Sequence, residues 1–384
     1  MGRKTDAIGP GDATWHTERM NIRVVKPADL TPQDLQLWKQ YQQRDTFLAN
    51  PFLCPEYIMA VSEIQEGVQV GIMECGSEIV GFFPFQKTTR NIGDPVGLRL
   101  CDISGPILKG GIAWDPKSVV RASGLSGWHF QNLIRSQTMQ PFEWACSEAP
   151  YLDLRGGFDK YKQERKRNGS NLFDEVARKS RKLERAVGPV RFQFHISDDR
   201  VFAQLLEWKG AQRDQTKTFN VLSMGWARAL LKRIEAIQTE DFAGLLSVLW
   251  AGDQLAAIHL GLRSRSILHY WIPTYNPGLG RYSPGSILLL ETARAASEMG
   301  ITRLDLGAGN ERYKHRFKSN SLMLGFGSVN CSLVSVVLSR IRCASHRCTV
   351  SSPLYAPIAS VKGALQRAYY WTLFRSTGLK RSEV

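Results

Sequence analysis

Residues 270–317 constrain the fold of this chain more than any other stretch. They read, in order, as a strand, a glycine-rich basic turn, a helix, a second strand and a polar segment with tyrosine and lysine. Ser283 is suited to cap the helix, Pro284 to begin it, and Gly300 to end it in the left-handed conformation. Free backbone N–H groups and the positive end of the helix dipole would then lie beside Arg281. Such a helix start binds phosphate or pyrophosphate, so the stretch predicts an anion site.

Length and composition predict a two-domain cytoplasmic protein. The chain of 384 residues exceeds the usual size of one hydrophobic core, so two domains of about 150 residues each are expected. No run reaches the roughly 18 to 20 apolar residues of a membrane helix, and the N-terminus lacks a secretory signal. Seven scattered cysteines read as reduced thiols. The one Cys/His group, Cys343, His346 and Cys348, lacks a second pair at zinc-site spacing, so no metal is predicted.

The net charge of +15 is the strongest bias of the whole sequence. Basic residues gather in residues 160–167 and again in residues 178–185. They read either as a solvated linker and an exposed helix face, or as a patch for a substrate phosphate, RNA or a membrane. The basic and aromatic tail, residues 341–384, is expected to pack on the catalytic unit. The alternative is that the tail contacts an anionic membrane surface, which would make the protein peripheral to the inner membrane.

Apolar periodicity divides the chain into a disordered leader (1–18), two units (19–165 and 166–340) and the tail. The Gly-rich, charged residues 150–170 read as the connection between the units. The first unit is expected to contain helices at 31–42 and 55–66, a hairpin of strands at 68–73 and 77–86, a strand at 98–103, a long helix at 116–137 and a strand at 142–146. The second is expected to begin with a helix at 171–186 and then to run strand, two helices, three antiparallel strands, helix, strand, short helix, strand.

Several short motifs carry a resemblance to a known family. They are NPF at 50–52, RKSRKLERAVGPVRF at 178–192, SPG at 283–285, LDLGAG at 304–309 and YKHRF at 313–317. In this order they resemble the CelD-type branch of the GNAT acetyltransferase superfamily, which is associated with bacterial cellulose and exopolysaccharide synthesis and is related to the Fem aminoacyltransferases. The resemblance implies an α/β (α+β) fold of two tandem GNAT-like units over residues 20–340. Each unit would be a mixed, mainly antiparallel sheet flanked by helices, with the chemistry mainly in the second.

The resemblance also implies an N- or O-acyltransferase. It would carry an acetyl group from acetyl-CoA to an amine or hydroxyl of a small-molecule or lipid-linked sugar in envelope polysaccharide synthesis. Two alternatives remain open. One is a Fem-like aminoacyltransferase that uses aminoacyl-tRNA and contacts the RNA through residues 160–185. The other is a binding protein that has kept the GNAT fold without the chemistry.

The turn before the predicted helix supplies the candidate donor-binding residues. GNAT proteins carry an Arg/Gln-x-x-Gly-x-Gly/Ala loop at this place, whereas this chain has GLGRYSPGS, so a structural turn with an ordinary helix start is the alternative. The residues assigned to coenzyme A binding are Arg281, Tyr282, Ser283, Gly285 and Ser286.

Proton transfer is assigned to His259 and Tyr275. On an alternating strand His259 shares a face with Ala257 and Gly261, and these small neighbours would leave room for a ligand. Burial without function is the alternative for His259. Tyr275 falls at the end of the next strand, nearest the turn. His269, on that strand, is a weaker candidate that either faces solvent or pairs across strands.

Asp305 and Lys314 complete the catalytic candidates. A carboxylate on a strand that should be buried requires a partner. Either the two residues form a structural ion pair, or Asp305 orients the acceptor while Lys314 neutralises a phosphate or an oxyanion. The candidates for binding a sugar phosphate or nucleotide-linked sugar are Lys209, Arg213, Lys217 and Tyr313; for the first three, the alternative is a charged helix end and loop.

Overall fold

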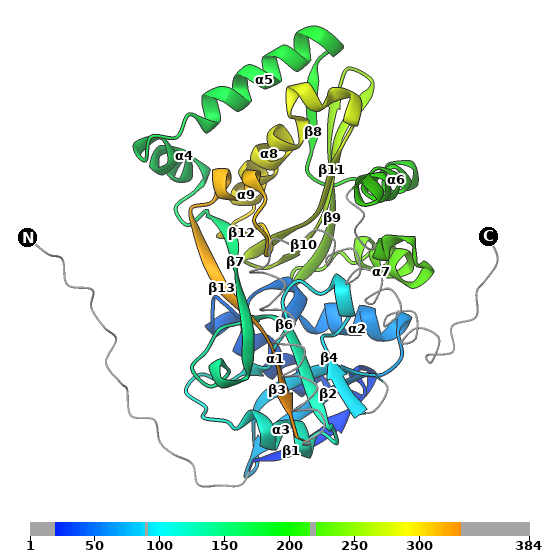
Figure 1. Cartoon of the computed structure of the whole chain (residues 1–384), viewed down its shortest axis with the longest axis vertical. Helices are drawn as coiled ribbons and strands as arrows, with labels where there is room; N and C mark the ends of the chain where they lie inside the picture. Colours follow the sequence, from blue (N-terminus) through cyan, green and yellow to red (C-terminus); the bar gives the residue numbers. More distant parts are fainter. Residues whose placement is uncertain (1–19, 89–90, 216–219, 332–384) are drawn as a thin grey trace, which may run out of the picture.

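The computed structural model describes residues 20–88, 91–215 and 220–331. The leader 1–18, Lys217, the Cys343, His346 and Cys348 group, and the tail 341–384 lie outside these residues. The described strands form one mixed, mainly antiparallel sheet with helices on both faces (Figure 1). The sheet type is as predicted for each unit, but the two units share a single sheet. The strand order is β1-β2-β3-β4-β6-β13-β7-β12-β11-β10-β9-β8, with β5 paired to β3.

The first long helix of the first unit, α1, is well capped. The Thr31 hydroxyl accepts the backbone N–H of Asp34, and the Asp34 carboxylate accepts the backbone N–H of Thr31, which makes a capping box. The elements of this unit are β1 (Asn21–Val25), η1 (Pro27–Asp29), α1 (Pro32–Arg44), η2 (Pro51–Leu53), α2 (Pro55–Ile64), β2 (Val68–Cys75), β3 (Glu78–Lys87), β4 (Ile92–Asp94), η4 (Leu98–Leu100), β5 (Ile107–Leu108), α3 (Pro116–Ala122), β6 (Gly127–Ile134), η5 (Gln140–Phe142) and β7 (Glu143–Asp153).

The second unit follows the predicted order of strands and helices, with one added helix at its start. Its elements are α4 (Phe158–Arg167), α5 (Leu172–Val187), β8 (Val190–Gln193), α6 (Asp199–Gln215), η6 (Val221–Ser223), α7 (Gly225–Glu235), β9 (Phe242–Ala251), β10 (Gln254–Ser264), β11 (Ile267–Tyr275), η7 (Pro277–Tyr282), α8 (Pro284–Glu298), β12 (Arg303–Asp305), α9 (Arg312–Phe317) and β13 (Asn320–Asn330).

The two units exchange strands. β13, from the end of the second unit, lies between β6 and β7 of the first and is antiparallel to both. β7 in turn pairs with β12, so that Tyr151 is opposite Asp305. Each half of the sheet is therefore completed by a strand from the other half, and the two units share one hydrogen-bonded ladder.

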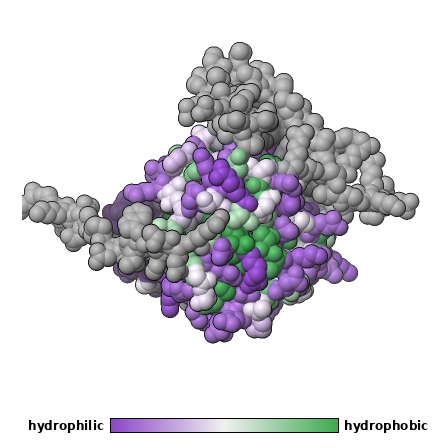
Figure 2. Space-filling model, turned by 90° about the horizontal axis from the view of Figure 1, so that it is seen from below, coloured by the Kyte–Doolittle hydropathy of each residue, from purple (hydrophilic) through white to green (hydrophobic). Residues whose placement is uncertain are grey.

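A shared apolar core fixes the two halves to each other. One cluster of buried side chains joins α1 and α2 of the first unit to α6 and α7 of the second, and includes a stacked pair, Trp38 and Phe82, at 4.8 Å. A second cluster lies between the sheet and α5 and α8, and a third between the first unit's strands and α3. Seen from the end that carries β1 and α3, the surface is mainly hydrophilic around a smaller apolar area (Figure 2).

Two local predictions for the chain before residue 170 are wrong. The helix predicted over 116–137 ends at Ala122, and Gly124, with φ +70°, turns the chain into β6. Trp128 and Phe130 on β6 are buried on one face of the sheet, so tertiary packing selects a strand there. The strand predicted at 98–103 is a 3-10 turn followed by a loop. The linker contains helix α4, whose Phe158 packs in the second core cluster.

No helix in the part of the chain that the structure describes has the length and apolarity needed to cross a bilayer.

Candidate active site

A cavity of about 540 Å³ opens where β11 and β12 separate. The two strands run parallel and pair only over residues 267–269 and 303–305, while β11 continues to Tyr275. One edge of β11 pairs with β12 as far as His269. Beyond His269, the same edge faces the cavity. The wall is built by both units: residues 99–102 from the first, and β11, α6, α9 and the start of α8 from the second.

The N-terminus of α8 forms one end of the cavity. The helix begins at Pro284 and spans 15 residues, as predicted, so its positive dipole end faces the cavity. Gly285 stands at the second helical position, where a backbone N–H has no intrahelical acceptor. The predicted cap by the Ser283 side chain is wrong. Ser283 has a left-handed backbone (φ 54°), and its hydroxyl makes no capping hydrogen bond.

The predicted donor-binding residues divide into two groups. Ser283, Gly285 and Ser286 line the cavity, and so does Gly280 of the same glycine-rich turn. Arg281 and Tyr282 do not line it. The exposed Arg281 guanidinium lies 4.7 Å from the centre of the Tyr282 ring, and that ring is buried in the core cluster beneath α8.

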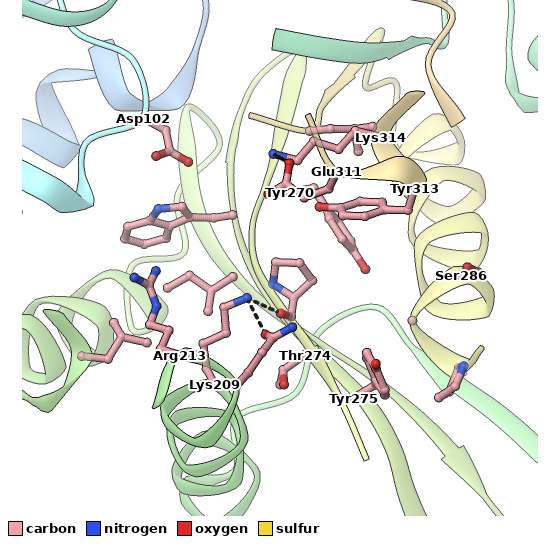
Figure 3. Close-up of a pocket in the computed structure, with 18 of the residues that line it drawn as sticks. Asp102, Lys209, Arg213, Tyr270, Thr274, Tyr275, Ser286, Glu311, Tyr313 and Lys314 are labelled. Carbon is pink, nitrogen blue, oxygen red and sulfur yellow. Dashed lines mark hydrogen bonds and ion pairs between the residues drawn. The ribbon is translucent and has the colours of Figure 1, made fainter. Parts of the chain in front are cut away.

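Two tyrosines form the aromatic wall beside α8 and α9. Figure 3 shows the Tyr313 ring reaching into the cavity from α9, with the Tyr270 ring next to it. Burial raises the pKa of Tyr313, and the Glu311 and Asp102 carboxylates raise it further, so its hydroxyl keeps its proton at neutral pH. Burial also raises the pKa of Tyr270 well above its usual value. The Tyr270 hydroxyl is buried without a hydrogen-bond partner among the described residues.

His259 lies behind Tyr270 and does not line the cavity. Its ring is fully buried and stacks on the Tyr270 ring, with 3.9 Å between centroids. The space above Gly261 is filled by the imidazole itself, because a Cβ there would lie 2.4 Å from the His259 Cε1 atom. Burial lowers the pKa of His259 well below its usual value, so the ring is neutral. The room predicted for a ligand on this strand face is therefore absent.

Lys209 and Lys314 bring two amines to the cavity. The Lys209 Nζ atom donates to the backbone carbonyl of Pro273 at 2.9 Å and to Gln212 at 3.1 Å (Figure 3). Burial, with Arg213 nearby, lowers the pKa of Lys209 to about 8. Lys314 donates to the carbonyl of Ala308 at 2.8 Å and pairs with Glu311 at 3.1 Å.

The ion pair predicted between Asp305 and Lys314 is not formed. Asp305 pairs instead with Arg303 through two hydrogen bonds of 2.7 and 3.2 Å, and it accepts a third, of 2.9 Å, from Asn50. Because these three bonds hold the carboxylate in the interior, Asp305 does not line the cavity. Residues two positions apart on a strand have side chains on the same face of the sheet. Arg303 therefore lies beside Asp305, whereas Lys314 is on a different element.

Two further predicted residues reach the cavity from its open side. Tyr275 ends β11 and is 43% exposed, and a Cβ added at Gly280 or Gly285 would lie 3.6 Å from its ring. Arg213 lines the wall on α6, and burial lowers its pKa. Lys217 lies outside the described residues.

Sequence reasoning missed Asp102, the carboxylate that the first unit contributes to the cavity. Its Oδ2 atom lies 3.1 Å from Nε2 of His269, which is buried and was considered only a weak candidate. Asn50, from the NPF motif, lies 3.4 Å from the other ring nitrogen of His269. The motif was noticed only as part of a resemblance, and Asp102 lay in a predicted strand without a pattern that marked it.

A comparison of the sequence with protein families gives a match within the second unit. Residues 170–315 match the Acetyltransferase (GNAT) domain family. The matched segment contains β11, α8, β12 and most of α9, and therefore most of the cavity wall. No curated protein sequence matches the chain.

Solved structures extend the similarity to both units. FemX matches with a TM-score of 0.53 and 8% identity, over 82% of this chain and 98% of that one. The DUF2156 C-terminal domain of a protein described as a lysylphosphatidylglycerol synthetase from Agrobacterium fabrum matches with a TM-score of 0.50 and 10% identity, over 80% and 95% of the two chains. A tandem GNAT protein from the clavulanic acid pathway has a TM-score of 0.47 and 10% identity, over 82% and 99%.

The predicted fold of two tandem GNAT-like units is confirmed by the likenesses to FemX and to the DUF2156 domain and by the sheet order. At such low identities they concern the fold alone. The finer assignment to the CelD-type branch stays a prediction.

Proposed function

We propose that the protein is an acyltransferase that takes an acyl group from a coenzyme A thioester, with acetyl-CoA as the simplest donor. The acceptor would be an amine or hydroxyl of a sugar or a sugar-linked molecule in envelope polysaccharide synthesis. The single observation that carries the proposal is the cavity, which joins the N-terminus of α8 to a wall of ionisable side chains along the edge of β11.

The chain's own groups fit an elongated anionic donor. Helix α8 offers a positive dipole end and the N–H of Gly285 to a pyrophosphate. The edge of β11 beyond His269 offers backbone groups to an extended arm, and the buried Tyr270 hydroxyl offers a hydrogen bond that no described residue satisfies. The bound thioester would supply an activated carbonyl.

Tyr313 is the group best suited to protonate the departing thiolate. Its hydroxyl reaches into the cavity (Figure 3), and the phenol carries its proton at neutral pH. Cationic Lys209 and Arg213, on the α6 side, would attract an acceptor that carries a phosphate or carboxylate. The aromatic rings of Trp271 and Tyr275 on the same wall suit the apolar face of a sugar ring.

A specific observation also supports the second candidate, a FemX-like aminoacyltransferase that uses aminoacyl-tRNA. The basic helix α5 packs against α8 and η7, and the Lys179 amine donates to the backbone carbonyl of Arg281 next to the start of α8. Positive charge therefore flanks the donor end of the cavity. RNA bound there would give an affinity that falls steeply with salt.

Titration calorimetry with coenzyme A tests the proposed donor. We expect Gly285→Asp to weaken coenzyme A binding by roughly tenfold or more, because a carboxylate would face the pyrophosphate. The fold should persist, since a Cβ at residue 285 lies 3.6 Å from its nearest neighbour and an acid suits a helix start.

Gly285→Ser is the matched control, because it adds a side chain without charge and should bind within a few-fold of the wild type. Unchanged affinity in Gly285→Asp would refute the assignment of the donor site. Stabilisation of the wild type against heat by tRNA, and not by acyl-CoA, would favour the second candidate.

A further inference from the structure

We propose that Asp102, supplied by the first unit, is the general base of acyl transfer, and that buried His269, Asn50, Asp305 and Arg303 fix its carboxylate. This inference rests on the proposed function. The active site would then be incomplete without the first unit, although the GNAT domain match begins only at residue 170.

The carboxylate of Asp102 faces the cavity, on the side opposite Tyr313 (Figure 3). Asp102 and Tyr313 are close enough for the carboxylate to raise the pKa of the phenol. An acceptor between them would have a proton acceptor on one side and a proton donor on the other. Glu311 is the other carboxylate in the wall, but it is paired with Lys314 at 3.1 Å.

The orientation of the Asn50 side chain is fixed by its own hydrogen bonds. Its Oδ1 atom accepts the backbone N–H of Phe52 at 3.1 Å, and its Nδ2 atom donates to Asp305 at 2.9 Å. Exchanging the two atoms would place an amide oxygen against a carboxylate, so the network permits one orientation only.

This orientation determines the tautomer of His269. The Nδ2 group of Asn50, which can only donate, also faces Nδ1 of His269 at 3.4 Å, so Nδ1 must be unprotonated. The single ring proton then resides on Nε2 and points at Oδ2 of Asp102, 3.1 Å away. His269 therefore acts on Asp102 as a hydrogen-bond donor and leaves Oδ1 available for the acceptor's proton.

Arg303 anchors the far end of this chain of groups. It gives Asp305 two hydrogen bonds and donates a third to the backbone carbonyl of Thr46 at 3.0 Å. Asn50 and Thr46 belong to the first unit, whereas His269, Asp305 and Arg303 belong to the second. The same contacts that orient Asp102 thus cross the boundary between the units.

The reaction step balances with these groups. As the neutral amine or the hydroxyl attacks the thioester, the new N–C or O–C bond forms and Asp102 takes the acceptor's proton. The C–S bond breaks, its electron pair goes to sulfur, and Tyr313 gives its proton to the thiolate. Asp102 gains one proton and Tyr313 loses one, so exchange through solvent restores both groups.

Steady-state kinetics of acyl transfer from acetyl-CoA test the role of Asp102. We expect Asp102→Asn to lower kcat by about 100-fold or more while the donor KM changes little. His269→Gln should lower kcat by about tenfold with an unchanged affinity for coenzyme A, because it acts through Asp102. A second Asp and His pair, Asp94 and His129, lies 3.1 Å apart on β4 and β6, so Asp94→Asn and His129→Gln serve as matched controls with unchanged turnover.

Nitrogen-15 NMR of the imidazole rings is the second readout, and it does not depend on turnover. The signal assigned by its loss in His269→Gln should be that of a neutral ring protonated on Nε2. A ring protonated on Nδ1, or on both nitrogens, overturns the proposed chain of groups. If His269→Gln does not fold, loss of the signal in His269→Asn provides the assignment instead. Full turnover by Asp102→Asn overturns the role of Asp102 alone, whereas absence of transfer by the wild type overturns the proposed function and this inference with it.

Discussion

At the scale of single residues, the cavity works by placing ionisable groups in surroundings that change their protonation. Lys209 shows this most plainly, because burial and the nearby Arg213 lower its pKa from 10.5 to about 8. Tyr313 responds in the opposite sense, since burial disfavours its anion and raises its pKa. One wall therefore holds an amine that can lose its proton near neutral pH, and the other a phenol that keeps its own.

The shifted pKa of Lys209 makes the stability of the fold depend on pH. Between about pH 8 and 10.5 the unfolded state holds this proton and the folded state does not, so raising the pH favours folding. We expect the free energy of unfolding of the wild type, relative to Lys209→Met, to rise by about 1 kcal/mol per pH unit in this window. Urea unfolding at pH 7.5 and 9.5 measures the difference. Lys160→Met, at an exposed position, is the control, and an equal difference at both pH values would contradict the assigned pKa.

The residues of the site were only partly predictable from the sequence. Ser283, Gly285 and Ser286 were predicted correctly because the local order of serine, proline and glycine marks the start of a helix. Asp102 was missed, since its role depends on His269, 167 residues away, and no local pattern encodes that contact. Asp305 was correctly expected to have a partner, but the partner is Arg303 on the same strand face.

At the scale of elements, the most informative segment is the turn, helix and strand from η7 to β12. Its bounds agree with the sequence because proline and glycine fix them: Pro284 begins α8, and Gly300, with φ +82°, follows its last turn. Elsewhere the periodicity of apolar residues led to a wrong prediction. Residues 116–137 were predicted to be one helix, but the left-handed Gly124 and the burial of Trp128 divide them into α3 and β6.

The left-handed backbone at Gly300 predicts a defined cost for a side chain there. Gly300→Ala should lower the free energy of unfolding by about 1 to 2 kcal/mol, because a Cβ is strained at this φ although no atom lies within 4 Å. Gly225→Ala is the matched control. It too has open space around it, but its φ is not positive and it begins helix α7, so the change should be neutral or stabilising. Equal effects of the two substitutions in urea would contradict the strain at Gly300.

At the scale of the whole molecule, the order of two tandem GNAT-like units was predictable, whereas their connection was not. The exchange of β7 and β13 depends on pairing between residues more than 150 positions apart. The local periodicity of apolar residues carries no information about such pairing. If Asp102 is the general base, the joining of the two units also matters for catalysis. Asp102 and β11 line one cavity, so the donor end and the proton-accepting side of that cavity come from different units.

The most direct test of the central claim is a crystal structure of the protein with coenzyme A. We expect the pyrophosphate at the backbone of Gly285 and Ser286, the extended arm along β11 beyond His269, and the sulfur between Asp102 and Tyr313. Coenzyme A bound away from the start of α8, or with its sulfur outside this cavity, would contradict the account.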